Sequence, residues 1–168
     1  MGIGALVPVP HVARAEVFLS AEQAAQLIFP TVVMTRKEVV LTPEQIKKIE
    51  ASLGDTIKNP KLLTFVGPKG EIVFVDQVLG KHEFITFAVG MNADGSVRGI
   101  EILEYRETYG SQVRNAEWRK QFLGKNSKSE LKLTSDIKNI SGATLSSAHV
   151  TAGVKRLVHT NEVLRTHT

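Results

Sequence analysis

This chain of 168 residues is long enough for the core of one domain and too short for two ordinary ones, and its 42% hydrophobic and 23% charged residues are typical of a globular protein. The formal net charge of +4 comes from scattered lysines and arginines without interleaved aromatic residues, which argues against a nucleic-acid-binding surface. The lack of cysteine excludes disulfides, cysteine-ligated iron–sulfur clusters and covalent c-type haem, so redox chemistry would need a bound organic cofactor.

The first fifteen residues resemble the end of an export signal. Residues 3–10 are apolar, and Ala13-Arg14-Ala15 fits an A-x-A cleavage site that would leave Glu16 as the new N-terminus. The basic segment that normally precedes the apolar run is missing, and the apolar run is short. Residues 1–15 are therefore interpreted either as a truncated export signal or as a flexible tail, and we favour the signal. No run approaches the roughly 20 apolar residues of a membrane span.

Residues 20–29 and 42–54 are predicted to be helices. Each begins with a capping box and ends at a helix-breaking residue, Pro30 or Gly54. The partly β-branched residues 31–41 between them predict a strand.

After Pro60 the pattern changes to strands joined by two hairpin turns, 67–70 and 92–95. The predicted strands are 62–66, 71–77, 84–90 and 97–105. A helix over 115–122, a polar linker, a brief extended piece at 131–133 and a long C-terminal helix follow. These elements predict a single α+β domain with an antiparallel sheet of about four or more strands and helices packed on one side of it.

The segment Ser141-Gly142-Ala143-Thr144-Leu145-Ser146-Ser147 comes directly before the amphipathic stripe of the C-terminal helix, so Thr144 is expected in its first turn. The start of a helix offers unpaired N–H groups and the positive end of the helix dipole, both of which favour a phosphate. Gly142 and Ala143 would keep the approach open. The alternative is that Ser141 or Thr144 only caps the helix.

This segment resembles the flavinylation motif of the FMN-binding domain family, found in the covalently flavinylated subunits of the sodium-translocating NADH:quinone reductase and of the Rnf complex. A second stretch, Glu107-Thr108-Tyr109-Gly110, resembles a segment of those subunits that lies close to the flavin, and Trp118 and Phe122 come between the two as in the family. The resemblance covers roughly residues 70–160. It implies that residues 16–168 form an FMN-binding domain.

The resemblance also implies roles for individual residues. Thr144 would carry FMN through a phosphoester made by a dedicated flavin transferase, and the phosphate and ribityl chain would be cradled by Ser141, Gly142, Ala143, Leu145 and Ser146. Glu107, Thr108 and Gly110 would lie near the flavin ring, and Glu107 and Thr108 would tune it. Trp118 would either pack on the ring or belong to the core.

Two positions depart from the family pattern. Lys138 stands where an acidic residue is usual, six positions before Thr144, and Asp136 is the nearest carboxylate. Lys138 would help to neutralise the phosphate or be an ordinary solvated lysine. Tyr109 replaces a proline.

Three functions are consistent with these observations. The first is a small exported flavoprotein that relays electrons between a membrane or periplasmic donor and a reductase, as a carrier rather than a stand-alone enzyme. The second is an FMN-dependent reductase of a small molecule, with Tyr105, Tyr109 or His149 as proton donor. The third is a flavin-free binding module. No metal site is expected, since none of the histidines has a ligand spacing: His11, His82, His149, His159 and His167.

The export hypothesis is tested at the N-terminus. We expect the gene to begin upstream and the mature protein to start at Glu16, because the apolar stretch is too short to engage a secretion machinery by itself. N-terminal sequencing of the protein from its native host measures this directly. An intact Met1 in a cytoplasmic fraction would defeat the hypothesis.

Overall fold

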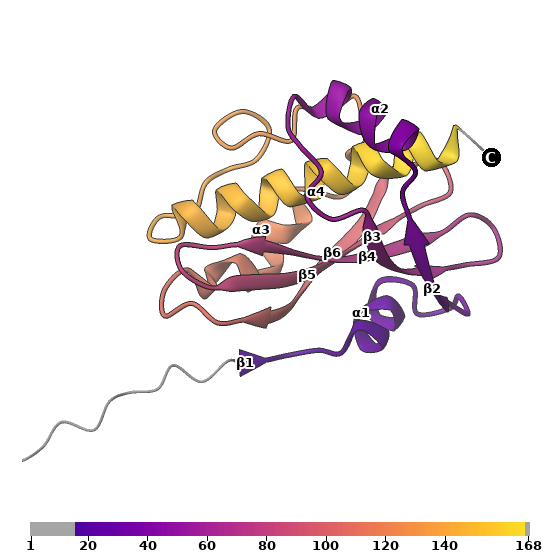
Figure 1. The fold of residues 1–168 in the computed structure, drawn as a ribbon. Helices are drawn as coiled ribbons and strands as arrows, with labels where there is room; N and C mark the ends of the chain where they lie inside the picture. Colours follow the sequence, from indigo (N-terminus) through magenta and orange to yellow (C-terminus); the bar gives the residue numbers. More distant parts are fainter. Residues whose placement is uncertain (1–15, 167–168) are drawn as a thin grey trace, which may run out of the picture.

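The computed structural model describes residues 16–166, so the predicted export signal and its cleavage site lie outside the described residues (Figure 1). The elements in chain order are β1 (Glu16–Val17), α1 (Ala21–Ile28), β2 (Thr35–Val40), α2 (Pro43–Leu53), β3 (Lys61–Val66), β4 (Ile72–Leu79), β5 (Phe84–Met91), β6 (Val97–Tyr105), the 3-10 helix η1 (Ser111–Arg114), α3 (Ala116–Lys120) and α4 (Thr144–Arg165). None of the helices in this part of the chain is long and apolar enough to cross a membrane.

The six strands form one antiparallel sheet in the order β1-β6-β5-β4-β3-β2. Strands β2 to β6 are therefore a meander in which each strand pairs with the next one along the chain. Both predicted hairpins are present, and the four strands predicted after Pro60 lie within two residues of their observed bounds. Strand β1 was not predicted, because two residues are too few to give a periodic pattern.

Helices cover both faces of the sheet, so the expectation that they pack on one side was wrong. Helix α1 lies against one face and α4 against the other, with α2 packed against α4 on that same side (Figure 1). The reason lies in β5, where Phe87, Ala88 and Val89 are all fully buried. Successive strand residues point to opposite faces, so a continuous apolar run needs cover on both.

The first two helices begin and end as predicted. Ser20 and Gln23 form the capping box of α1, with hydrogen bonds of 3.1 and 2.8 Å, and Thr42 and Gln45 form that of α2. Gly54 ends α2 in the left-handed conformation, at φ +70°.

The segment between α3 and α4 differs from the prediction. Residues 131–133 form no strand, and only an isolated bridge joins Leu133 to Ile137. Leu131 has a φ of +47°, which an extended strand does not allow. Helix α3 is also shorter than predicted, because turns replace it after Lys120.

Gly153 allows α4 to approach the sheet closely, and this predicts the effect of a substitution there. A Cβ at Gly153 would lie 2.6 Å from Cζ of Phe87 and 2.8 Å from Cγ1 of Val78. Alanine in a helix normally stabilises by up to about 1 kcal/mol relative to glycine, but overpacking costs about 1 to 3 kcal/mol, so we expect Gly153→Ala to lower the free energy of unfolding. Denaturant titration measures this. Gly99→Ala is the control, since its Cβ would come no closer than 3.7 Å to another side chain.

Candidate functional site

The N-terminus of α4 has no side-chain cap. Thr144 is the first helical residue, the N-cap position belongs to Ala143, and no acidic residue lies in the first turn. Gly142, two residues before the first helical residue, has a φ of +82°, a conformation that glycine adopts without strain. Ser141, Gly142, Thr144 and Leu145 are exposed, whereas Ala143 is buried. The first N–H groups of a 22-residue helix therefore keep their capacity to bind an anion.

Asn139 orients the hydroxyl of Thr144. Its Nδ2 donates to Oγ1 of Thr144 over 3.0 Å, and its Oδ1 accepts a hydrogen bond of 2.8 Å from Oγ of Ser147. The side chain of Asn139 thus bridges two turns of the segment and leaves Thr144 on the surface. Asn139 was not predicted as a site residue, since a single polar residue five positions before Thr144 carries no distinctive signal.

Tyr105, at the end of β6, joins the two motifs. Its hydroxyl donates to the carbonyl oxygen of Tyr109 and lies 2.9 Å from Oγ of Ser146. Burial raises the pKa of Tyr105, although the hydrogen bond with Ser146 opposes the shift. Gly110 has a φ of +95°, and a Cβ there would come within 2.5 Å of both the Tyr105 and the Ser146 oxygens. The segment 107–110 therefore lies directly beside the start of α4.

This arrangement places Ser146 differently from Ser141 and Thr144. Ser146 was predicted to help cradle the phosphate, but it is 5% exposed and its hydroxyl is bound to Tyr105. The contact of Ser146 with Tyr105 instead connects the start of α4 to the end of β6.

Glu107 holds the turn between β4 and β5. Its Oε1 accepts hydrogen bonds from the backbone N–H groups of His82, at 2.5 Å, and Glu83, at 3.1 Å. Burial by itself would raise the pKa of Glu107, but these backbone hydrogen bonds outweigh it and the pKa lies below its usual value. The second motif thus begins with a carboxylate that is held as an anion. Thr108 next to it is exposed.

Trp118 belongs to the core. It is 6% exposed, its ring meets that of Phe122 edge-on with centroids 5.2 Å apart, and its Nε1 donates to the carbonyl oxygen of Lys138 over 2.8 Å. The indole therefore fixes the backbone of the loop that leads to Thr144. Little of its ring is left for a ligand.

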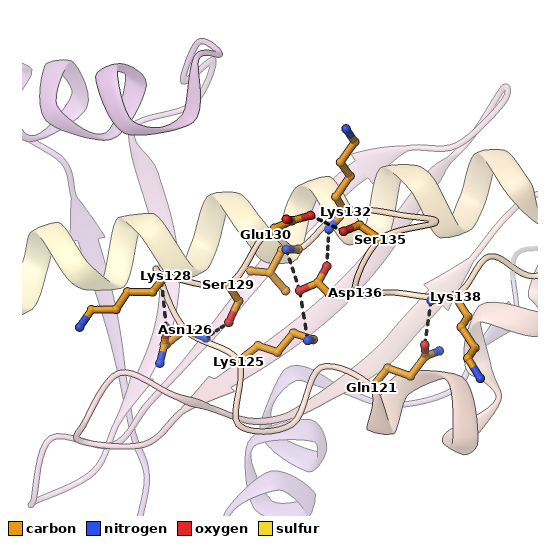
Figure 2. Close-up of polar contacts among 11 residues, drawn as sticks. Gln121, Lys125, Asn126, Lys128, Ser129, Glu130, Lys132, Ser135, Asp136 and Lys138 are labelled. Atoms are coloured by element: carbon orange, nitrogen blue, oxygen red, sulfur yellow. Dashed lines mark hydrogen bonds and ion pairs between the residues drawn. The ribbon is translucent and has the colours of Figure 1, made fainter.

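Asp136 organises the same loop, as Figure 2 shows. Its carboxylate accepts from the backbone N–H groups of Leu131, at 3.1 Å, and Lys132, at 2.9 Å, and pairs with Nζ of Lys125 at 3.1 Å. Burial opposes ionisation, but these contacts hold the pKa of Asp136 below its usual value. The side chain of Lys138 is exposed and extends away from Asp136, and its backbone N–H donates to Gln121 over 2.8 Å.

A cavity of about 870 Å³ lies between α4, strands β3 and β4, and the loop 55–59. His149 lines it, neither ring nitrogen of His149 has a hydrogen-bond partner among the described residues, and Nδ1 is buried. Leu79 and Phe84 lie at its border, face each other across β4 and β5, and are 53% and 51% exposed. Their neighbours Val78 and Ile85 pack under α4, so the Leu79 and Phe84 side chains point to the other face of the sheet. Such a volume suits an organic cofactor or a small ligand. No cluster of three potential metal ligands occurs in the described part of the chain.

Two comparisons with known proteins found similar sequences. Residues 80–159 match the model of the FMN-binding domain, a range that includes both motifs. One subunit of the Na(+)-translocating ferredoxin:NAD(+) oxidoreductase complex of Acetobacterium woodii is 29% identical over 125 residues. The match covers 66% of this chain and 60% of that protein, so the chain spans less than two thirds of its relative's length.

The charge of Glu107 provides a test of the electrostatics of this site. Glu107→Gln keeps an oxygen that accepts from His82 and Glu83, so the turn should persist, while the loss of a negative charge should favour an anionic reduced flavin and raise its potential. A change of ~30 mV corresponds to ~1.4 kcal/mol for a two-electron couple. Spectroelectrochemical titration measures the midpoint potential. An unchanged potential would mean that Glu107 acts on the turn alone.

Proposed function

We propose that this chain, which contains a domain of the FMN-binding domain family, carries FMN on Thr144 and relays electrons between partner proteins. The family match points to FMN as the cofactor. The relative from Acetobacterium woodii is by its name part of an oxidoreductase complex, which supports electron transport within such an assembly.

One observation carries the assignment of Thr144. It is the first residue of α4, and because Ala143 provides no side-chain cap, the N–H groups of the first turn are left for an external oxygen. A phosphate esterified to Thr144 would lie at the positive end of the helix dipole, with no acidic residue in the first turn to repel it. The residues present therefore fit the phosphate of FMN.

The residues around Thr144 would prepare its hydroxyl for attachment. Asn139 Nδ2 donates to Oγ1, which leaves the hydroxyl hydrogen free to be given up when the phosphoester forms. The exposure of Ser141, Gly142 and Thr144 gives a flavin transferase access to the segment. Lys138, also exposed, would add a positive charge to the loop that precedes this segment.

When bound, FMN supplies one- and two-electron chemistry. The chain would hold the phosphate at α4, keep the Glu107 segment beside it through Tyr105, and maintain a negative charge at Glu107. We place this activity outside the cytoplasm, with membrane or periplasmic partners, on the strength of the A-x-A pattern at residues 13–15.

A second candidate is reduction of a small molecule, and one observation favours it. Of the three proton donors considered for this function, Tyr105 is buried with its hydroxyl already bonded, whereas His149 lines a cavity with both ring nitrogens unpartnered among the described residues. Steady-state turnover with candidate acceptors separates a reductase from a carrier.

Thr144→Val tests the attachment point, because valine keeps the shape of threonine and removes the hydroxyl. The native protein, co-expressed with a flavin transferase, should give a fluorescent band on a denaturing gel under ultraviolet light, and the variant should give none. Thr35→Val, the same substitution at an exposed threonine of β2 outside both motifs, is the matched control and should keep its fluorescence.

The outcomes separate the possibilities. A fluorescent band from Thr144→Val would refute the assignment of Thr144. A yellow native protein whose band is dark after denaturation would show that FMN is held without a covalent bond.

A further inference from the structure

A short N-terminal strap, residues 16–18, runs along the outer edge of β6. It consists of β1 and Phe18. In the antiparallel ladder Glu16 is paired with Tyr105, the last residue of β6, and the N–H group of Phe18 donates to the carbonyl oxygen of Leu103 over 2.9 Å. Strand β5 pairs with the other side of β6. The strap therefore supports the end of β6 from the side that β5 leaves open.

The aromatic ring of Phe18 joins the strap to the 3-10 helix η1. The guanidinium carbon of Arg114 lies 3.3 Å from the centroid of the Phe18 ring, which is a cation–π contact. Arg114 is the last residue of η1, and its carbonyl oxygen accepts a hydrogen bond of 3.1 Å from Nε of Arg119. Phe18 also packs against the core on the α4 side of the sheet. The ring is therefore held between the core and Arg114.

The strap contacts both ends of the second motif, residues 107–110. This segment begins two residues after Tyr105 and ends at Gly110, the N-cap of η1. The strap is paired with Tyr105 through the backbone and with Arg114 through the Phe18 ring. A loop whose two ends are fixed has fewer conformations open to it. The strap therefore restricts the backbone of the second motif without touching the motif itself.

We propose that the strap holds the second motif in its conformation and that Phe18 and Arg114 are positioning residues for it. Their contact ties the end of η1 to the same strap that pairs with β6, so the motif is held between two fixed points. The inference rests on the proposed function only in that the motif is expected near the flavin. It also agrees with the expected cleavage after residue 15, which would leave every residue of the strap in place.

The test measures backbone order parameters by NMR relaxation on the full chain, produced without a flavin transferase. Phe18→Leu keeps an apolar side chain for the core and removes the ring. The order parameters of the N–H groups of residues 107–110 should fall from about 0.85, the value of a rigid backbone, to below about 0.6. Phe18→Tyr, the matched control, keeps the ring and should keep the native values.

Arg114→Gln tests the other partner of the contact. Arg114 is exposed, so this substitution leaves the core intact and serves even where Phe18→Leu fails to fold. It removes the cation and should loosen residues 107–110 in the same way. The double variant Phe18→Leu, Arg114→Gln should show no larger loss of order than either single variant, because both substitutions delete one contact.

Unchanged order parameters at residues 107–110 in Arg114→Gln would overturn the inference. An equal loss of order in β5 would also overturn it, because the contact would then stabilise the whole fold rather than the motif. A Phe18→Tyr protein as loose as Phe18→Leu would show that the ring face has no positioning role. No flavin is present in this measurement, so its outcome is independent of the gel assay on Thr144, and a failed inference would leave the proposed function intact.

Discussion

The hydroxyl of Tyr105 is the contact on which the site depends. Tyr105 is the last residue of β6, and its hydroxyl donates to the carbonyl oxygen of Tyr109 and contacts the hydroxyl of Ser146. These two contacts hold the loop after β6 against the first turn of α4. Both contacts are buried or partly buried, where a hydrogen bond is poorly replaced by water. Gly110 is required by this arrangement, since a Cβ would collide with both oxygens.

Carboxylates around the site hold loops, and the proposed phosphate position at the start of α4 has none in its first turn. Glu107 binds two backbone N–H groups of the β4–β5 turn, and Asp136 binds two in the loop before α4, together with Lys125. In both cases burial opposes ionisation and the hydrogen bonds prevail, so both pKa values are lowered. An acidic residue in the first turn of α4 would repel the phosphate that we propose at this helix terminus.

Packing of α4 against the sheet fixes the position of the candidate site, because Thr144 lies at the N-terminus of this helix. Strand β5 is buried on both sides, with α1 against one and α4 against the other. Gly153 brings α4 close to Phe87 and Val78, and this close packing fixes the helix whose N-terminus carries Thr144. The cavity is lined by α4, by strand β4 and by the loop 55–59. Helix α4 therefore carries the proposed attachment point at its N-terminus and forms one wall of the cavity farther along.

The sequence by itself determined the local structure. Capping boxes at Ser20 and Thr42, turn residues between the strands and the stripe of α4 are signals between near neighbours in the chain, and each predicted an element that is present. The position of Thr144 in the first turn followed from the same local pattern. The tertiary structure decided how residues far apart are used: that Trp118 is buried in the core, that Ser146 is bound to Tyr105, that Asn139 orients Thr144, and that helices cover both faces of the sheet. These outcomes depend on which side chains meet across the sheet and between loops, and no local periodicity encodes such contacts.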